Sequence, residues 1–350
     1  MYLFFSSDAF DLYRRDIISS LALPQGYTTH FRYPRKILPN DQAFTNLCGQ
    51  DGMIIYARGN DLSKRIEERN LDFLPIRSVS VADIDDNKTT GLVHLYLKLG
   101  EFIKSDSLKI RLENAYELIP PYKFIYQDNT VFGTTQCAWH DKMEELVTFD
   151  EVFKDKLFYQ LNIRYQGTDG NGQAVIDYDS AERGSAFQLT EGKQYALDLA
   201  IYNSSRRAAD YEKHSIRLDY DRENFFITNP GDIVIGADKD NRSYKIVTKD
   251  LQSNRSASYI KVQSSLKGEH EDDKDVIACE VVVRLNINRN SNKLWAQIFA
   301  SICTFLGSVS GAYGASQLKP NGYYPAPFII IGLMFVLGAS VLQFLYSGKR

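Results

Sequence analysis

The chain has 350 residues and a formal net charge of −3, and 44% of its residues are hydrophobic and 24% are charged. This composition excludes a disordered polar chain, a collagen-like repeat and a strongly basic nucleic-acid-binding protein. At about 100–200 residues per domain, the length is enough for two or three domains.

The first 135 residues favour short strands separated by glycine and proline. Strands are predicted at 2–5, 28–33, 53–57, 74–81 and 92–99, with helices around 10–20 and 62–70. Residues 1–135 are therefore predicted to form a small β-barrel or an α+β domain. Charged residues follow Met1 within ten positions, so the start of the chain lacks the apolar region of a secretion signal. We expect this part to stay in the cytosol.

Basic and aromatic residues alternate in the stretch from His30 to Lys36. Arginine beside aromatic rings suits a phosphate-bearing or nucleotide ligand. Arg32, Tyr33, Arg35 and Lys36 are therefore the candidate ligand-binding residues. The alternative is a solvated strand face without a ligand.

Residues 136–185 are predicted to connect two domains through a helix, near 140–155, and a first strand. Cys137 and His140 lie close together here and suggest half of a zinc site or a Cys/His nucleophile. Zinc needs four ligands, and no second pair with suitable spacing supplies the others. P-loop and dinucleotide-binding motifs are also missing from the sequence. We therefore expect no metal, no cofactor and no catalytic residue.

Residues 186–290 show period-2 alternation in short runs separated by turns. The last run is the clearest, with Cys279, Val281, Val283, Leu285 and Ile287 on one face. Strands at regular spacing predict an antiparallel β-sandwich. The stretch resembles an immunoglobulin-type sandwich, although it has neither the disulfide nor the tryptophan typical of one.

The C-terminal region differs from the rest of the chain. From Leu294 onward there is no Asp or Glu, and the only charged residues are Lys319, Lys349 and Arg350. About 20 apolar residues in a helix cross the hydrocarbon core of a bilayer. Two transmembrane helices are predicted, at 294–317 and 328–346, joined by a turn rich in proline. A buried hairpin in a soluble protein is the alternative.

The orientation of this hairpin follows from its flanking charges. Arg289, Lys293, Lys349 and Arg350 lie at its two ends, whereas only Lys319 lies in the turn. Positive residues favour the cytoplasmic side. The chain is therefore predicted to be a two-span protein of the cell inner membrane, with the N-terminal domains and the C-terminus in the cytoplasm.

Small residues recur every four positions in the first predicted span, at Gly307, Gly311 and Ala315. Small residues allow close approach of helix backbones in lipid. This face is predicted to pack helices together, either between copies of the chain in a homo-oligomer or within one chain, against Gly332 and Ala339.

Only five residues, 288–292, separate the last predicted strand from the first predicted span. A short connection transmits motion that a long flexible linker would absorb. The order of modules, a β-rich part before a two-helix hairpin, resembles that of bacterial membrane effectors in anti-phage systems. The resemblance implies a non-enzymatic sensor or effector that acts on the inner membrane.

Two alternatives to this function stay open. One is a passive membrane scaffold that recruits a cytosolic partner encoded nearby. The other is an enzyme that acts on a nucleotide or a lipid head group.

Overall fold

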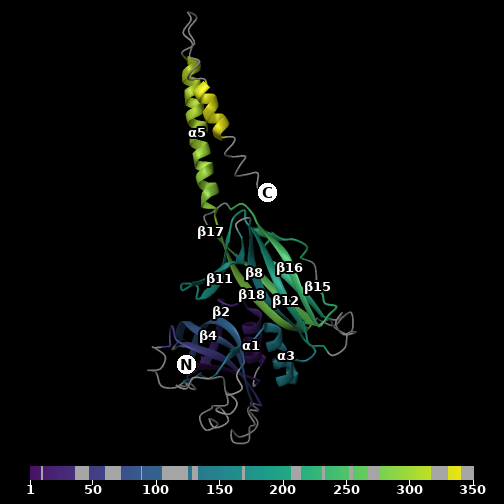
Figure 1. The fold of residues 1–350 in the computed structure, drawn as a ribbon. Helices are drawn as coiled ribbons and strands as arrows, with labels where there is room; N and C mark the ends of the chain where they lie inside the picture. Colours follow the sequence, from purple (N-terminus) through teal and green to yellow (C-terminus); the bar gives the residue numbers. More distant parts are fainter. Residues whose placement is uncertain are drawn as a thin grey trace, which may run out of the picture.

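A computed structural model describes most of the chain as a mainly β body with a projecting helix pair (Figure 1). The described residues are 1–8, 11–35, 47–59, 72–87, 89–104, 125–127, 133–167, 170–205, 214–230, 233–251, 255–266, 276–316 and 330–339. The predicted helix at 62–70 and the candidate residue Lys36 lie outside these ranges.

The N-terminal part is α+β and holds a seven-stranded sheet. Its order is β2-β5-β4-β3-β1-β6, with β7 also paired to β5. Its strands are β1 (Tyr2–Ser7), β2 (Thr28–Pro34), β3 (Asp51–Arg58), β4 (Asp72–Asn87), β5 (Leu92–Lys104), β6 (Ile125–Gln127) and β7 (Thr135–Gln136). β1 and β3 run parallel. All five strands predicted from the sequence in this part are confirmed, and β4 and β5 extend beyond the predicted bounds.

Helix α1 (Asp11–Ala22) confirms the helix predicted near residues 10–20. Its buried face includes Ile17, Ile18 and Leu21. Apolar residues at this spacing lie on one side of a helix and pack against a core. α1 contacts β1, β2 and β4 of the first sheet and also β8 and β18 of the following sheets, so it is shared by both parts of the body.

The second part of the body consists of two further sheets. One has the order β10-β11-β18-β17-β13-β15 and the other β14-β16-β12-β8-β9. The strands are β8 (Leu157–Gly167), β9 (Gly170–Gln173), β10 (Val175–Asp179), β11 (Gly184–Thr190), β12 (Gln194–Asn203), β13 (His214–Tyr220), β14 (Phe225–Ile227), β15 (Ile233–Val234), β16 (Lys239–Thr248), β17 (Arg255–Leu266) and β18 (Val276–Asn288).

The two sheets contact each other through β8, β17 and β18. Tyr159 of β8 donates to the Val262 carbonyl of β17 at 2.6 Å, and Ser264 of β17 donates to the Leu157 carbonyl at 2.7 Å. Most pairings are antiparallel, but β11 and β18 are parallel. The immunoglobulin-like character of this part stays a prediction.

The segment predicted as a connection begins with α3 (Trp139–Phe149) and the short helix η5 (Glu151–Phe153). It also contains β8, which pairs with β12 from Leu157 to Gln166. One cluster of buried side chains runs through all three sheets. The two parts of the body therefore share a core. The predicted boundaries at 135, 185 and 290 stay a prediction.

Helix α5 (Ser291–Ser316) starts two residues after β18 and leads away from the body, and residues 330–339 form a second helix beside it (Figure 1). We call these two segments the helix pair. Among the residues that the structure describes, no helix is both long and apolar enough to cross a membrane. The predicted spans at 294–317 and 328–346 are thus not confirmed as transmembrane helices and stay a prediction.

Candidate functional site

The structure describes three of the four candidate ligand-binding residues, Arg32, Tyr33 and Arg35, and places them in different surroundings. Arg32 lies half-buried on the outer face of β2, whereas Tyr33 points into the core and is fully buried. The Tyr33 hydroxyl donates to the Phe5 carbonyl at 3.2 Å, and burial raises the pKa of Tyr33 well above its ordinary value. Arg35 forms an ion pair with Asp86. Successive residues of a strand point to opposite faces, so Arg32 and Tyr33 do not share one surface. Ligand binding by the four candidate residues stays a prediction.

Two further arginines of the first sheet have structural roles. Arg77 is completely buried and donates to the carbonyls of Gly100 at 2.6 Å, Ser20 at 2.8 Å and Leu23 at 2.7 Å. Burial lowers the pKa of Arg77 to about 9. Arg58 forms an ion pair with Asp72.

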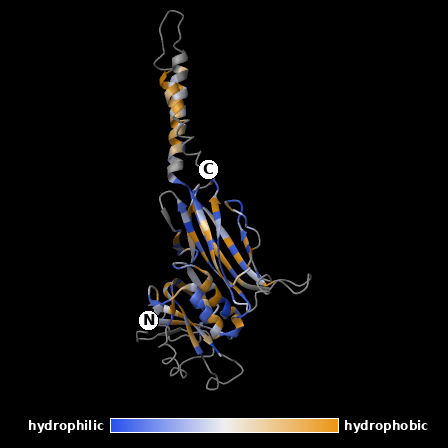
Figure 2. Ribbon diagram, turned by 45° about the vertical axis from the view of Figure 1, so that its right-hand side comes forward, coloured by the Kyte–Doolittle hydropathy of each residue, from blue (hydrophilic) through white to orange (hydrophobic). Residues whose placement is uncertain are grey.

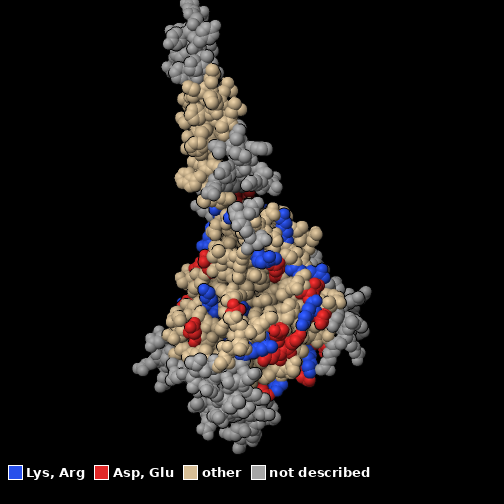
Figure 3. Space-filling view, viewed as in Figure 1, with Lys and Arg blue, Asp and Glu red and all other residues tan. Residues whose placement is uncertain are grey.

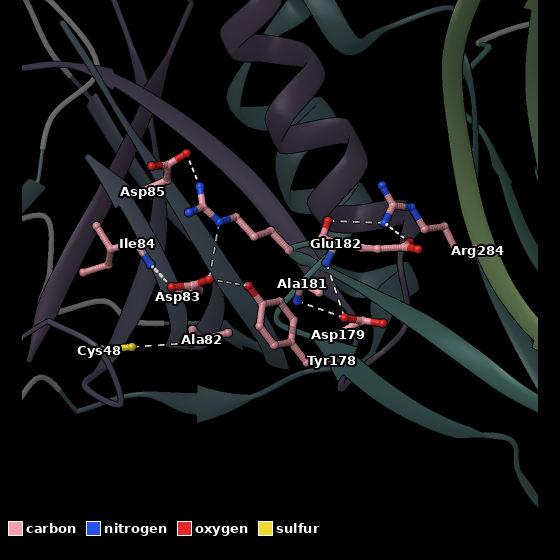
Figure 4. A network of polar contacts seen from close by, with 11 residues as sticks. Cys48, Ala82, Asp83, Ile84, Asp85, Tyr178, Asp179, Ala181, Glu182 and Arg284 are labelled. Atoms are coloured by element: carbon pink, nitrogen blue, oxygen red, sulfur yellow. Dashed lines mark hydrogen bonds and ion pairs between the residues drawn. The ribbon is translucent and has the colours of Figure 1, made fainter. Parts of the chain in front are cut away.

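A polar junction joins the outer face of the first sheet to the hairpin between β10 and β11 (Figure 4). The Tyr178 hydroxyl donates to Asp83 at 3.1 Å, and Arg183 forms an ion pair with Asp85. Arg183 has a φ of +47°, a left-handed conformation that is unfavourable for a residue with a side chain. The sequence does not reveal this junction, since its partners lie about a hundred residues apart.

Three rings lie on the outer face beside this junction. His30 stacks on His94 with centroids 5.0 Å apart and on Tyr96 with centroids 4.9 Å apart. Their positions follow from the register, in which His30 is paired with Tyr96, and Arg32 with His94. The cross-strand partner of Arg32 on this face is therefore His94.

The surroundings of Cys137 and His140 disfavour an activated nucleophile. Burial raises the pKa of the Cys137 thiol, which disfavours the reactive thiolate. The Nε2 atom of His140 is buried and makes no hydrogen bond in the described part of the chain. Within the same residues, no group of three or more His, Cys, Asp and Glu side chains could hold a metal ion.

The helix pair places Gly307 against the second helix. A Cβ atom at Gly307 would lie 2.8 Å from the Gly332 carbonyl oxygen and 2.9 Å from the Val336 side chain. A small buried cluster of Ala300, Cys303 and Ala339 continues the contact between the two helices, beginning one helical turn before Gly307. Gly307 thus serves packing within one chain. Gly311 and Ala315 lie further along α5, and the contacts of their side chains are outside what the structure describes.

The helix pair lacks the strongly hydrophilic residues that are frequent in the body (Figure 2), and many of its apolar side chains are exposed. The exposed apolar side chains are Trp295, Ile298, Phe299, Ile302, Phe305, Leu306 and Val309 on α5, and Ile330, Ile331, Leu333, Met334, Phe335, Val336 and Leu337 on the second helix. Trp295, Phe305 and Met334 are each 68% exposed. Lys, Arg, Asp and Glu lie over the body, and the described part of the helix pair shows none of them in Figure 3. A largely apolar surface of this size indicates an interaction site, although Ser301, Thr304 and Ser308 are also exposed on α5.

A buried carboxylate lies where the body meets the helix pair. Glu191 is 3% exposed and accepts hydrogen bonds from the backbone N–H groups of Asn290 and Leu251, both at 3.2 Å. Its own N–H donates to the Asn288 carbonyl at 2.9 Å. Glu191 therefore fastens the residue just before α5 to the turn between β11 and β12. It was not among the residues predicted from the sequence.

Comparisons with known proteins give little further information. No family model matches the sequence, and no curated protein matches it. Among solved structures, the chain is similar to the secreted serine protease VesC from Vibrio cholerae, with 9% sequence identity over 79% of this chain and 72% of that chain. The TM-score of 0.20 is too low to carry an argument about fold or activity.

Proposed function

We propose that this protein is a membrane-anchored sensor or effector whose β-rich body responds to a signal and whose helix pair enters the lipid bilayer. The observation that carries the proposal is the apolar, uncharged outer surface of the helix pair, which projects away from a charged body. Large apolar side chains gain free energy on leaving water, and lipid is a partner that covers them on all sides.

We further propose that the helix pair crosses the membrane twice, as predicted from the sequence. The two spans would lie at 294–317 and 328–346, with the body and the C-terminus in the cytoplasm. The excess of positive residues at both ends of the hairpin supports this orientation.

Membrane fractionation of the full chain tests the anchor. We expect the protein to sediment with membranes, to resist alkaline carbonate and to dissolve in detergent. The variant Phe305→Asp/Met334→Asp should lose much of its membrane association, because a charge in the bilayer is costly. Phe226→Asp, which changes an exposed residue of β14, is the matched control. Full-length protein dissolved without detergent would contradict the proposal.

The joint between body and helix pair favours an effector over a passive scaffold. Only Arg289 and Asn290 separate β18 from α5, and Glu191 binds the second of them. A change in the body would therefore move α5 directly. In an effector, overproduction should depolarise the membrane, and Glu191→Ala should weaken this effect at equal membrane abundance. In a scaffold, an unrelated anchor should replace the helix pair without loss of activity.

The anti-phage role rests on the order of modules alone. It predicts that expression of the chain lowers the plating efficiency of phages on a sensitive host. Protection should disappear in the Phe305→Asp/Met334→Asp variant and persist in Phe226→Asp. Equal plating with and without the chain would contradict this role and would leave the anchor itself unaffected.

A further inference from the structure

A shallow depression of about 350 Å³ lies on the outer face of the third sheet, and the residues that line it belong neither to the junction nor to the helix pair. It is lined by residues of three neighbouring strands: β8, β12 and β16. Its centre is Ala200, a half-buried residue of the central strand β12. The small side chain leaves space between the longer residues on either side.

The strand register places polar side chains around Ala200 in two rows. Gln160 and Asn241 are the partners of Ala200, and Asn162 and Ser243 are the partners of Asp198. Paired residues of neighbouring strands point to the same face, as do residues two apart in one strand. These polar side chains therefore project from the same face of the sheet, around Ala200.

The charged groups here are already paired. Asp198 accepts hydrogen bonds from Arg164 at 3.0 Å and from Ser243 at 2.7 Å, and Arg242 is paired with Asp240 at 2.8 Å. The side-chain amides of Gln160 and Asn241, by contrast, have no hydrogen-bond partner among the described residues. A phosphate would have to compete with these carboxylates for the arginines, whereas a hydroxyl group needs only the amides.

We propose that this depression binds a ligand with neighbouring hydroxyl groups, either a free saccharide or the ribose of a nucleoside. Each amide offers both donors and an acceptor, and so matches hydroxyl groups, which donate and accept. A ligand of this class would be the signal to which the β-rich body of the proposed sensor responds. This inference therefore rests on the proposed function for its biological meaning.

Calorimetric titration of the detergent-purified full chain tests the site, with maltose, adenosine and 2′,3′-dideoxyadenosine as probes. In Ala200→Phe the larger side chain fills the depression, so binding should be abolished. Gln160→Leu should weaken it about fivefold, the loss of one neutral hydrogen bond. Ala257→Phe, the same change at an exposed position of β17, is the matched control and should bind as the parent does.

The outcomes separate the two sources and decide the proposal. Maltose binding that Ala200→Phe removes identifies a free saccharide. Binding of adenosine but not of dideoxyadenosine identifies a ribose. No saturable binding of either hydroxyl ligand, equal binding of both nucleosides, or binding that survives Ala200→Phe would overturn the proposal. Because the titration needs no bilayer, its failure is distinct from failure of the anchor.

Discussion

Arg77 shows how a residue that suggests ligand binding can instead hold the fold together. Its guanidinium group links the end of α1, through Ser20 and Leu23, to Gly100 of β5. The side chain also lies over the Phe102 ring, with 4.2 Å from Cζ to the centroid. The three carbonyls and the Phe102 ring compensate for the burial of a positive charge, which would otherwise cost free energy.

We expect Arg77→Met to lower the free energy of unfolding by about 3 kcal/mol, because three buried carbonyls lose their donor. Urea denaturation of the purified protein, followed by near-ultraviolet circular dichroism, measures this change. Arg217→Met, at an exposed position of β13, is the control and should change stability little. An equally small effect at Arg77 would show that water replaces the guanidinium group.

Because Tyr27 is buried, we expect the free energy of unfolding to decrease in alkali. Burial raises the pKa of Tyr27 from 10.0 to about 12, and its oxygen accepts the N–H of Arg284 at 2.9 Å. The unfolded chain thus releases this proton at lower pH than the folded chain. The stabilising contribution is complete below pH 10 and declines as the pH rises through 12.

Urea midpoints measured at a series of pH values from neutral to strongly alkaline check this prediction. Tyr27→Phe removes the titrating group, so its midpoint should fall less steeply with pH than that of the parent. The comparison uses the slope, because the variant also loses the hydrogen bond from Arg284. Parallel slopes for the two proteins would contradict the assignment.

At the scale of elements, the contact between α5 and the second helix depends on Gly307. We expect Gly307→Leu to separate the two helices, since even a Cβ atom lies within 3 Å of Gly332 and Val336. Oxidative cross-linking of native Cys303 to a cysteine in Ala339→Cys reports the contact. The cross-link should form in the parent background and decrease strongly with Gly307→Leu.

Ser308→Leu is the matched control for this experiment, because Ser308 is the exposed neighbour of Gly307. It should leave the cross-link intact. Loss of the cross-link in both variants would mean that the helices separate for a reason other than the close approach at Gly307.

For the whole molecule, the predicted orientation can be tested with a native thiol. Cys48 is exposed on the body, whereas Cys279 and Cys303 are buried. A membrane-impermeant maleimide should label Cys48 in inverted inner-membrane vesicles and spare it in right-side-out vesicles. Cys48→Ser controls for labelling elsewhere. The reverse pattern would place the body outside the cytoplasm.

Features that depend on local pattern can be predicted from the amino-acid sequence. Alternation of apolar residues located the strand β18, because residues two apart share a face. It did not reveal β17, where Ser258 and Ser264 occupy buried positions and interrupt the apolar pattern. Their hydroxyls are satisfied by Asp221 and by the Leu157 carbonyl, which only the fold brings near.

The sequence also located the two long uncharged runs at the C-terminal end, on either side of Lys319, and the short connection before them, since both are properties of consecutive residues. Which side chains meet became clear from the folded chain. The tertiary structure buried Tyr33, paired Arg35 with Asp86 and placed Gly307 against a helix of the same chain. It also brought Glu191 beside Asn290 across a hundred residues. Contacts between distant residues depend on sheet register and packing, and neither is encoded in local spacing.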